Sequence, residues 1–368
     1  MDKGDRKYLA ITYFTLLISI ILAASWNYLG DPYGMWRISP EKPLDLFWHT
    51  RLHKPYRMQE VRASHLILGS SRSGRIPADS SDVNSVIYNA AHPGTTLYEI
   101  RRQLEHGQAI RSIESVIIGL DFYMFRRDKE KLLFKDLDDR LARIDSGTRL
   151  LVHHYKQILF DYWRILFSRS AVLASYYAHN NSQTSSRRFY PAGHWESIPG
   201  PVDSKTLFER LANQKRREFK ELGRELDFNQ FTKILEFCLN EGIRTDILVS
   251  PIHAKQMKVI NDADRWSDYL GYHRELVRIS SKYKNHGLNV RVVGFEHNRD
   301  LVHDSIENPK WFRDGIHYNL LTGRKIVNCL WGAGTQCESP IEPWDISRAN
   351  LEGYLREIDR NRRRFVPD

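Results

Sequence analysis

One serine and a distant aspartate–histidine pair are the residues of this chain whose types and spacing could do covalent chemistry. Ser71 stands in SHLILGSSRSGR (64–75), where an apolar run gives way to a glycine and a polar turn. Asp314 and His317 lie three apart in WFRDGIHYN (311–319). An aspartate can hold the tautomer of an imidazole whose other ring nitrogen takes a serine proton. The three side chains therefore predict a Ser-His-Asp set for acyl transfer.

The elements that must position these residues follow an α/β pattern. Short apolar runs typical of buried parallel strands occur at residues 64–69, 85–91, 115–121, 244–250 and 289–295. Helix-like stretches separate them, which predicts a mostly parallel five-stranded sheet covered on both faces. Ligands bind at the carboxyl ends of the strands in such sheets. Because the serine follows the first strand and the aspartate–histidine pair follows the fifth, we expect the three to meet at that edge.

Three further polar residues follow strands and are candidates for binding substrate. Arg72 adjoins the serine, His92 follows the second strand and His253 follows the fourth. Arg72 could bind an acidic sugar or phosphate, or pair with a nearby carboxylate. Each histidine could contact substrate or make a structural hydrogen bond. The cysteine and histidine spacings are not those of a metal site, and we expect neither a metal nor a cofactor.

The two motifs together resemble those of the SGNH/GDSL hydrolase superfamily, namely Gly-Ser-Ser after the first strand and Asp-x-x-His near the end. In that superfamily the nucleophile ends the first block, which maps onto Ser71. The glycine of the second block maps onto Gly94 in NAAHPGTT (89–96). A glycine lets the main chain approach closely, so the backbone N–H groups of Ser71 and Gly94 are the expected oxyanion donors.

The third block departs from the family pattern. The family has Gly-x-Asn-Asp there, and this chain has GLDF at 119–122, with Asp121 in place of the asparagine that usually donates to the oxyanion. A carboxylate at that point opposes catalysis unless it is protonated or turned away. Asp121 could instead fix the Gly69–Ser71 turn or bind Arg72.

Within the superfamily, the resemblance is to membrane-anchored proteins that modify surface polymers: the alginate O-acetylation proteins and the D-alanine transfer protein of teichoic acid synthesis. It implies a three-layer α/β/α sandwich of the flavodoxin-like kind. The implied activity is O-acyl transfer to a cell-surface polysaccharide or polymer through an acyl-serine, with a membrane-bound acyltransferase as a possible donor partner. An esterase (deacetylase) of the same fold, or a non-catalytic polymer-binding or assembly partner, stays open as an alternative.

The amino-terminal segment indicates the compartment. Residues 8–30 carry no charge, and about 20 apolar residues suffice to cross a bilayer. Lys3, Arg6 and Lys7 precede the segment, as in a helix whose amino terminus stays in the cytoplasm. A signal peptide cleaved near the small residues 23–25 is one alternative, and a buried core helix is another. The anchor and the signal peptide both predict an exported domain, and the anchor predicts a single-pass protein of the cytoplasmic (inner) membrane facing the periplasm or cell exterior.

The net positive charge of the chain indicates which classes of binding partner to expect. With 55 Lys and Arg against 45 Asp and Glu, the formal net charge is +10, which favours anionic partners such as phospholipid head groups or acidic polysaccharide. No zinc-finger, homeodomain or RNA-recognition signature accompanies this charge, so nucleic acid is not an expected partner.

The chain divides by composition into an anchor, a stalk, a domain with a helical insertion, and a basic amphipathic tail: 1–30, 31–60, 61–337 with the insertion at about 122–229, and 338–368. The aromatic stretch 150–177 within the insertion could cap the sheet or rest on the membrane as an interfacial helix. The tail could dock on the domain or on the membrane.

Overall fold

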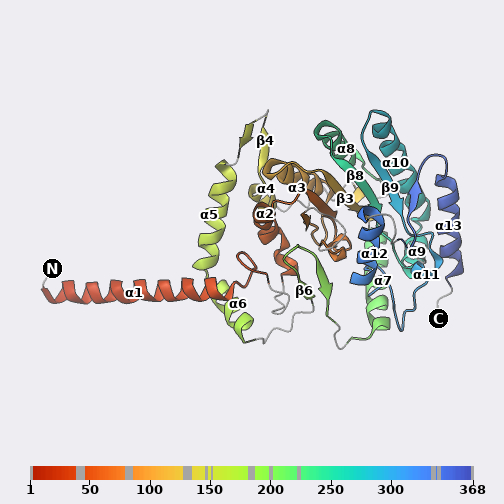
Figure 1. The fold of residues 1–368 in the computed structure, drawn as a ribbon. Coiled ribbons are helices and arrows are strands. Elements are labelled where there is room, and N and C mark those ends of the chain that lie inside the picture. The colour runs from red at the N-terminus through yellow and green to blue at the C-terminus, as the bar shows by residue number, and fades with distance from the viewer. Residues whose placement is uncertain are drawn as a thin grey trace.

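A mostly parallel, six-stranded sheet forms the centre of the molecule (Figure 1). The computed structural model describes residues 3–38, 46–78, 86–126, 135–145, 148–150, 152–180, 187–198, 202–221, 225–332, 337 and 341–365. In spatial order the strands are β10 (Trp344–Ile346), β9 (Val290–Gly294), β8 (Arg244–Val249), β3 (Ser115–Leu120), β1 (His65–Gly69) and β2 (Ile87–Asn89).

The five predicted strands are all present, and they are parallel to one another. Taken in chain order they lie 2-1-3-4-5, which is the flavodoxin-like arrangement. The expected count of five is wrong, because β10 adds a sixth strand antiparallel to β9. This edge strand spans three residues and has no apolar run of its own, so its sequence carries little strand signal.

Strand side chains alternate between two buried clusters. Leu66 and Leu68 of β1 enter one cluster, whereas Ile67 enters the other. The first cluster is completed by α3 (Leu97–Ile110), α8 (Asn229–Glu241), α10 (Trp266–Asn285) and α13 (Leu351–Arg364). The second is completed by α12 (Leu320–Trp331) and by residues 311–318. Apolar residues on both strand faces are thereby buried, as a continuous apolar strand requires.

The long amino-terminal helix α1 (Lys3–Gly30) projects away from the domain (Figure 1). It is long and apolar enough to cross a membrane, and its apolar stretch is not buried in the protein. The segment after it folds back onto the domain, with Met35 and Tyr56 buried, and continues into α2 (Thr50–Val61). Short helical turns occur at Phe47–His49, Ser73–Arg75 and Phe122–Phe125.

The insertion holds both helices and short strands. Its helices are α4 (Lys135–Arg140), α5 (Val152–Leu166), α6 (Arg169–His179) and α7 (Ser204–Glu221). Two hairpin-like pairs that the sequence analysis did not predict join them: β4 (Arg143–Asp145) with β5 (Thr148–Leu150), and β6 (Arg187–Phe189) with β7 (Trp195–Ser197). Strands of three residues are too short to show alternation.

The carboxyl-terminal segment is part of the domain. In α13, Tyr354, Leu355 and Ile358 are buried in the core, and Asn361 Nδ2 donates to the carbonyl of Glu296 at 2.9 Å. Of the two alternatives for the tail, the structure therefore shows docking on the domain, and the boundary expected at residue 337 does not separate it. Residues 338–340 and 366–368 of that tail lie outside the described part of the chain.

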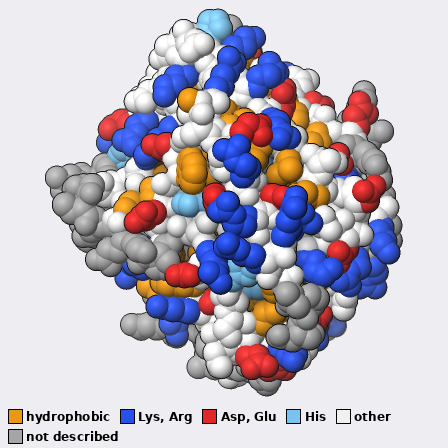
Figure 2. Space-filling model, turned by 90° about the vertical axis from the view of Figure 1, so that its right-hand side faces the viewer, with side chains coloured by type: hydrophobic (Ala, Val, Ile, Leu, Met, Phe, Trp, Pro, Cys, Tyr) orange, Lys and Arg blue, Asp and Glu red, His pale blue; other side chains and the backbone are white. Residues whose placement is uncertain are grey.

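Two remaining helices, α9 (Ala254–Asp262) and α11 (Arg299–Val302), complete the domain. Cys329 of α12 is joined to Cys337 by a disulfide, and Cys238 is a buried free thiol. Figure 2 shows the side of the molecule opposite to α1, where Lys and Arg alternate with Asp and Glu and hydrophobic side chains are scattered.

Candidate active site

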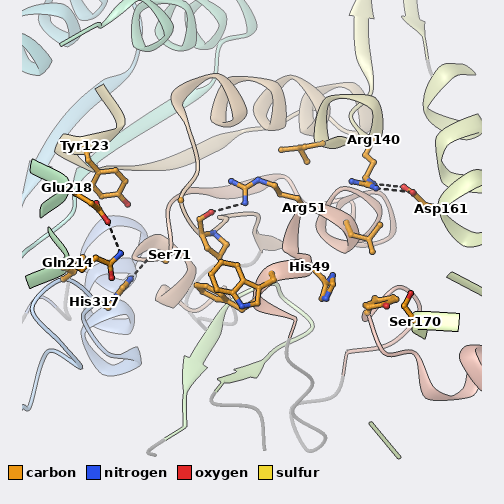
Figure 3. Close-up of a pocket in the computed structure, with 18 of the residues that line it drawn as sticks. His49, Arg51, Ser71, Tyr123, Arg140, Asp161, Ser170, Gln214, Glu218 and His317 are labelled. Carbon is orange, nitrogen blue, oxygen red and sulfur yellow. Dashed lines mark hydrogen bonds and ion pairs between the residues drawn. The ribbon is translucent and has the colours of Figure 1, made fainter. Parts of the chain in front are cut away.

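The structure brings Ser71, His317 and Asp314 into one hydrogen-bonded relay. Ser71 Oγ lies 2.8 Å from His317 Nε2 (Figure 3). His317 Nδ1 lies 3.0 Å from each carboxylate oxygen of Asp314. Since the carboxylate can only accept, Nδ1 carries the proton and Nε2 is left to accept from the serine hydroxyl. This is the arrangement in which a histidine acts as general base toward a serine.

A pair of glycines sets the position of the Ser71 turn. Gly69 ends β1 with φ of +140°, a conformation that L side chains rarely adopt, and it pairs in register with Gly119 of β3. A Cβ on Gly69 would come 2.3 Å from Ser73 Oγ, and a Cβ on Gly119 would come 1.9 Å from the same oxygen. The absence of both side chains lets the turn pack directly against the ends of β1 and β3.

Asn89, at the end of β2, ties the second strand to this turn. Its Nδ2 donates to the carbonyls of Ser73 and Ile76, both at 2.8 Å. The sequence analysis did not single it out. A polar residue that ends the apolar run SVIYN was the signal that could have found it.

The loop that carries the base is held by two carboxylates. Asp314 Oδ1 accepts from the backbone N–H of Ile316 at 2.9 Å and of His317 at 2.7 Å, so the orienting residue also shapes the turn. Asp304 accepts from the backbone N–H groups of Lys310, Trp311 and Phe312 at 2.7–2.9 Å. Asp304 was missed, because an aspartate ten residues upstream of Asp314 has no distinguishing local pattern.

The electrostatics of the relay suit a base that is neutral at rest. Burial lowers the pKa of His317 below its usual 6.5, and the charge of Asp314 raises it again only in part. Burial alone would raise the pKa of Asp314, but the contacts with His317 and the charge of Arg75 outweigh it and hold that pKa below its ordinary range. Arg75, which the sequence analysis also missed, is buried and donates to Ser197 Oγ at 2.9 Å. Burial lowers the pKa of Arg75 itself to about 10.

Gly94 lines the same cavity as Ser71, as the oxyanion assignment requires. It is exposed, with φ of +61°, and a Cβ there would meet nothing within 4 Å. Among the described residues, no acceptor is bonded to the backbone N–H of Ser71 or of Gly94. Within the described residues neither N–H group is thus committed to another partner, as the expected role of an oxyanion donor requires.

The loop around Gly94 is fixed by Glu99. Glu99 and Thr96 form a capping box at the start of α3, which satisfies backbone N–H groups at the helix terminus. Arg51 pairs with Glu99 at 2.7 Å and donates to the carbonyl of Pro93 at 3.1 Å. Lys54, which is buried, donates to the carbonyls of Asn89 and Ala91.

Asp121 and Arg72 form a buried ion pair beside the turn that carries Ser71. Arg72 Nη1 donates to Asp121 Oδ1 at 2.8 Å, and the hydroxyl of Ser70 donates to the other carboxylate oxygen. Both residues are buried, and neither lines the cavity that holds Ser71. Of the roles expected for them, the structure shows the carboxylate fixing the turn and the arginine pairing with it.

The two histidines placed after strands are buried away from the cavity. His253 Nδ1 accepts from the N–H of Lys255 at 3.0 Å, and its Nε2 donates to the carbonyl of Asp304 at 2.8 Å. His253 therefore caps α9 and holds Asp304, which in turn holds the loop that carries His317. Of the two roles expected for His253, the structure thus shows the structural hydrogen bond. His92 is fully buried, and within the described residues neither of its ring nitrogens has a hydrogen-bond partner. Burial, together with the nearby charges of Arg51 and Lys54, lowers the pKa of His92 well below 6.5.

A cavity of about 820 Å³ leads from the relay toward the insertion (Figure 3). Ser71 and His317 lie at one end, whereas Arg140, Asp161 and Ser170 lie at the other. Its cationic lining side chains are Arg51, Arg126, Arg140, Arg164 and Lys215, and its acidic ones are Asp161 and Glu218. The cations outnumber the acids, so the cavity favours an anionic ligand.

Most of the lining charges are held by ion pairs. Arg140 binds Asp161 through two hydrogen bonds of 2.6 and 3.1 Å, and Lys215 lies 2.6 Å from Glu218. The sequence analysis named none of these residues, because the charged stretches of the insertion have the composition of a solvated surface. In the described part of the chain, no group of three or more His, Cys, Asp or Glu residues is placed to hold a metal ion.

Comparison with known proteins adds no family assignment. No family model matches the chain, and no curated protein matches it.

Proposed function

We propose that this chain is a membrane-anchored, SGNH-like acyl-ester enzyme that acts on a cell-surface polysaccharide or polymer, with O-acyl transfer as its reaction. The observation that carries the proposal is the relay from Ser71 through His317 to Asp314, open to a cavity large enough for a sugar chain. The proposed scaffold is a three-layer α/β/α sandwich.

The mechanism uses this chain's own groups. His317 Nε2 takes the Ser71 proton as Oγ attacks the carbonyl carbon of an acyl ester, and the backbone N–H groups of Ser71 and Gly94, which line the same cavity, are the proposed donors to the resulting oxyanion. Collapse of the tetrahedral species breaks the ester C–O bond, and His317 returns the proton to the departing alcohol. The product is an acyl-serine.

The second half of the reaction decides between transferase and esterase. A hydroxyl of the polymer gives its proton to His317 and attacks the carbonyl carbon of the acyl-serine. Collapse of the tetrahedral species breaks the bond from that carbon to Ser71 Oγ, and His317 returns the proton to Oγ, which leaves the polymer acylated and Ser71 restored. Water in place of that hydroxyl would make the protein an esterase. The cationic cavity supports a polymer acceptor, and α1 supports a site on the outer side of the cytoplasmic membrane beside a membrane-bound acyl donor.

The alternative is a non-catalytic protein that binds polymer or assembles with a membrane acyltransferase. The engagement of Asp121 by Ser70 and Arg72 favours it, because the residue at the place of the family's asparagine is committed to the turn. The oxyanion would then be left with backbone donors alone.

A serine-reactive fluorophosphonate separates the two. We expect the full-length protein in detergent to gain one adduct by intact mass, and the Ser71→Ala and His317→Ala variants to gain none. Ser170→Ala is the matched control, since it removes a hydroxyl from the far end of the same cavity and should leave labelling intact. A folded wild-type protein that gains no adduct would support the binding protein instead.

A further inference from the structure

Helices α5 and α6 turn an apolar face to the outside. On α5 and at the residue directly after it, the exposed stripe at helical spacing consists of Lys156, Leu159, Phe160, Trp163, Arg164 and Phe167. Leu159 is 69% exposed and Trp163 is 65% exposed, and the Trp163 ring lies 4.3 Å from that of Phe167. On α6 the exposed apolar residues are Leu173, Tyr176 and Tyr177. We call these seven apolar side chains of the two helices the α5–α6 face.

The opposite side of α5 explains why the helix keeps this orientation. Ile165 is buried beside Met35 and Tyr56. Asp161 is buried as well, and it accepts from Tyr56 and Arg140. The helix is therefore fastened to the domain through its polar and aliphatic inner side, and the aromatic side is left outward.

The α5–α6 face begins where the apolar span of α1 ends. Asn27, buried near the end of α1, donates to the carbonyl of Leu166 at 2.8 Å and accepts from Ser175 Oγ at 3.2 Å. The neighbouring Trp26 Nε1 donates to the carbonyl of Val172 at 3.4 Å. In Figure 1, α1 leaves the domain at this point, and α5 runs roughly perpendicular to α1 near the carboxyl-terminal end of α1. A bilayer crossed by α1 would thus have its surface at α5 and α6.

The exposed charges among the described side chains of these two helices are all positive. Among their described side chains, the exposed Lys and Arg are Lys156, Arg164 and Arg169, and the one acidic residue, Asp161, is buried in its ion pair. Exposed aromatic and aliphatic residues flanked by cations are the composition of helices that lie in a membrane interface. The opposite side of the molecule, in Figure 2, mixes both signs and has only scattered hydrophobic side chains.

We propose that the α5–α6 face is a docking surface for anionic phospholipid, with its aromatic residues at the boundary between head groups and acyl chains and with Lys156, Arg164 and Arg169 against the phosphates. The surface holds the domain in one orientation on the bilayer. Because Arg164, Ser168 and Ser170 also line the cavity, that orientation places the end of the cavity remote from Ser71 beside the head groups. The proposal depends on α1 crossing the membrane and does not depend on the reaction proposed above.

The test measures the depth of nitroxide labels on the full-length protein, held at one chain per nanodisc of mixed phosphatidylglycerol and phosphatidylcholine. Labels go on the Phe160→Cys and Trp163→Cys variants, with Leu16→Cys in α1 as the embedded reference. Leu321→Cys is the matched control, because Leu321 is an exposed leucine on α12. Cys238 is buried and the other two cysteines are paired, so the nitroxide adds at the introduced position.

We expect the labels at positions 160 and 163 to collide with oxygen and to be shielded from an aqueous nickel chelate, as at position 16 and unlike position 321. Reversing Lys156, Arg164 and Arg169 to glutamate should restore nickel accessibility at position 160 while circular dichroism stays unchanged. Labels at 160 and 163 that are as water-accessible as at 321, with position 16 embedded, would overturn the proposal. Shielding that requires two chains per disc would overturn it too, since the occupant would then be a second copy.

Discussion

The two walls of the cavity are built by different means. On the sheet side, Ser71, Gly94 and His317 sit on turns held by backbone hydrogen bonds, buried carboxylates and a glycine pair that leaves no room for a side chain. On the insertion side, Arg140, Arg164 and Lys215 sit on helices, and two of the three are held by ion pairs between side chains. The first construction fixes atoms to within the tolerance of a hydrogen bond, as catalysis requires. The second presents charge, which suits the binding of the polymer substrate proposed above.

This difference predicts that changes to the sheet wall abolish chemistry, whereas changes to the insertion wall alter substrate binding. The largest effect is expected at the relay itself. Ser71→Ala or His317→Ala should lower kcat for a small activated ester by about 10⁶-fold, and Asp314→Asn by about 10⁴-fold through loss of the productive tautomer. Hydrolysis of p-nitrophenyl acetate measures all three. If the Ser71→Ala variant kept the wild-type turnover, the residues of the sheet wall would not be the ones that hydrolyse the ester.

The second largest effect on the sheet wall is expected from a substitution in the pair Gly69 and Gly119. Gly119→Ala places a methyl group 1.9 Å from Ser73 Oγ, so the turn must move, at a cost of about 1–3 kcal/mol in the free energy of unfolding. We expect a lower Tm and the loss of fluorophosphonate labelling. Gly271→Ala is the control: its Cβ meets nothing within 4 Å inside α10, and it should raise stability by about 0.4–1 kcal/mol. Unchanged labelling in Gly119→Ala would show that the close packing does not set the serine position.

The pH profile tests the electrostatics of the same wall. Because the base must be neutral and the pKa of His317 is lowered, kcat/KM should fall only as the pH drops through a value below 6.5. The charge of Arg75 contributes to that lowering, so Arg75→Met should move the acid limb to higher pH. Ser197→Ala removes the hydrogen bond of Arg75 but keeps its charge, and should leave the limb in place. Identical acid limbs in the wild type and Arg75→Met would contradict this account.

The insertion wall should show the smallest effects. Arg164 is exposed and lines the cavity, and one such charge contributes roughly 0.2–1 kcal/mol. Arg164→Ala should raise KM for an anionic oligosaccharide by up to about fivefold at low salt, while kcat changes little. Arg169→Ala is the matched control, because Arg169 is an exposed arginine at the start of the neighbouring helix α6 and does not line the cavity. A drop in kcat without a change in KM would place Arg164 in the chemistry.

Much of the sheet and the relay could be predicted, because the signals are local. The five apolar runs each bury side chains on both faces of a strand, and such runs are visible in sequence. Ser71 and the Asp314–His317 pair could be recognised because strand ends of a parallel sheet meet at one edge. The strand β10, in contrast, gains its place from pairing with β9, and three residues carry no such signal.

The positioning residues lay beyond sequence reasoning for a related reason. Asp304 acts on backbone groups six to eight residues away, and Asn89 acts on a turn that precedes it by 13–16 residues. The polar end of an apolar run could single out Asn89, but neither that pattern nor an aspartate in a loop indicates which N–H or carbonyl the side chain will meet. For Arg72 and Asp121 the sequence left two roles open, and their pairing across the turn settled that contact.

The sequence by itself determined the class of fold, the long apolar helix at the amino terminus and the three residues of the relay. The apolar runs of the strands, the length of the apolar span and the short motifs around Ser71 and His317 are each properties of contiguous residues. Tertiary structure alone decided which charges line the cavity and that α5 and α6 meet the base of α1. It also decided that the carboxyl-terminal helix belongs to the core. These features join segments far apart in the sequence, such as Asn27 and Ser175, which are 148 residues apart. Such contacts depend on packing complementarity, which no local pattern encodes.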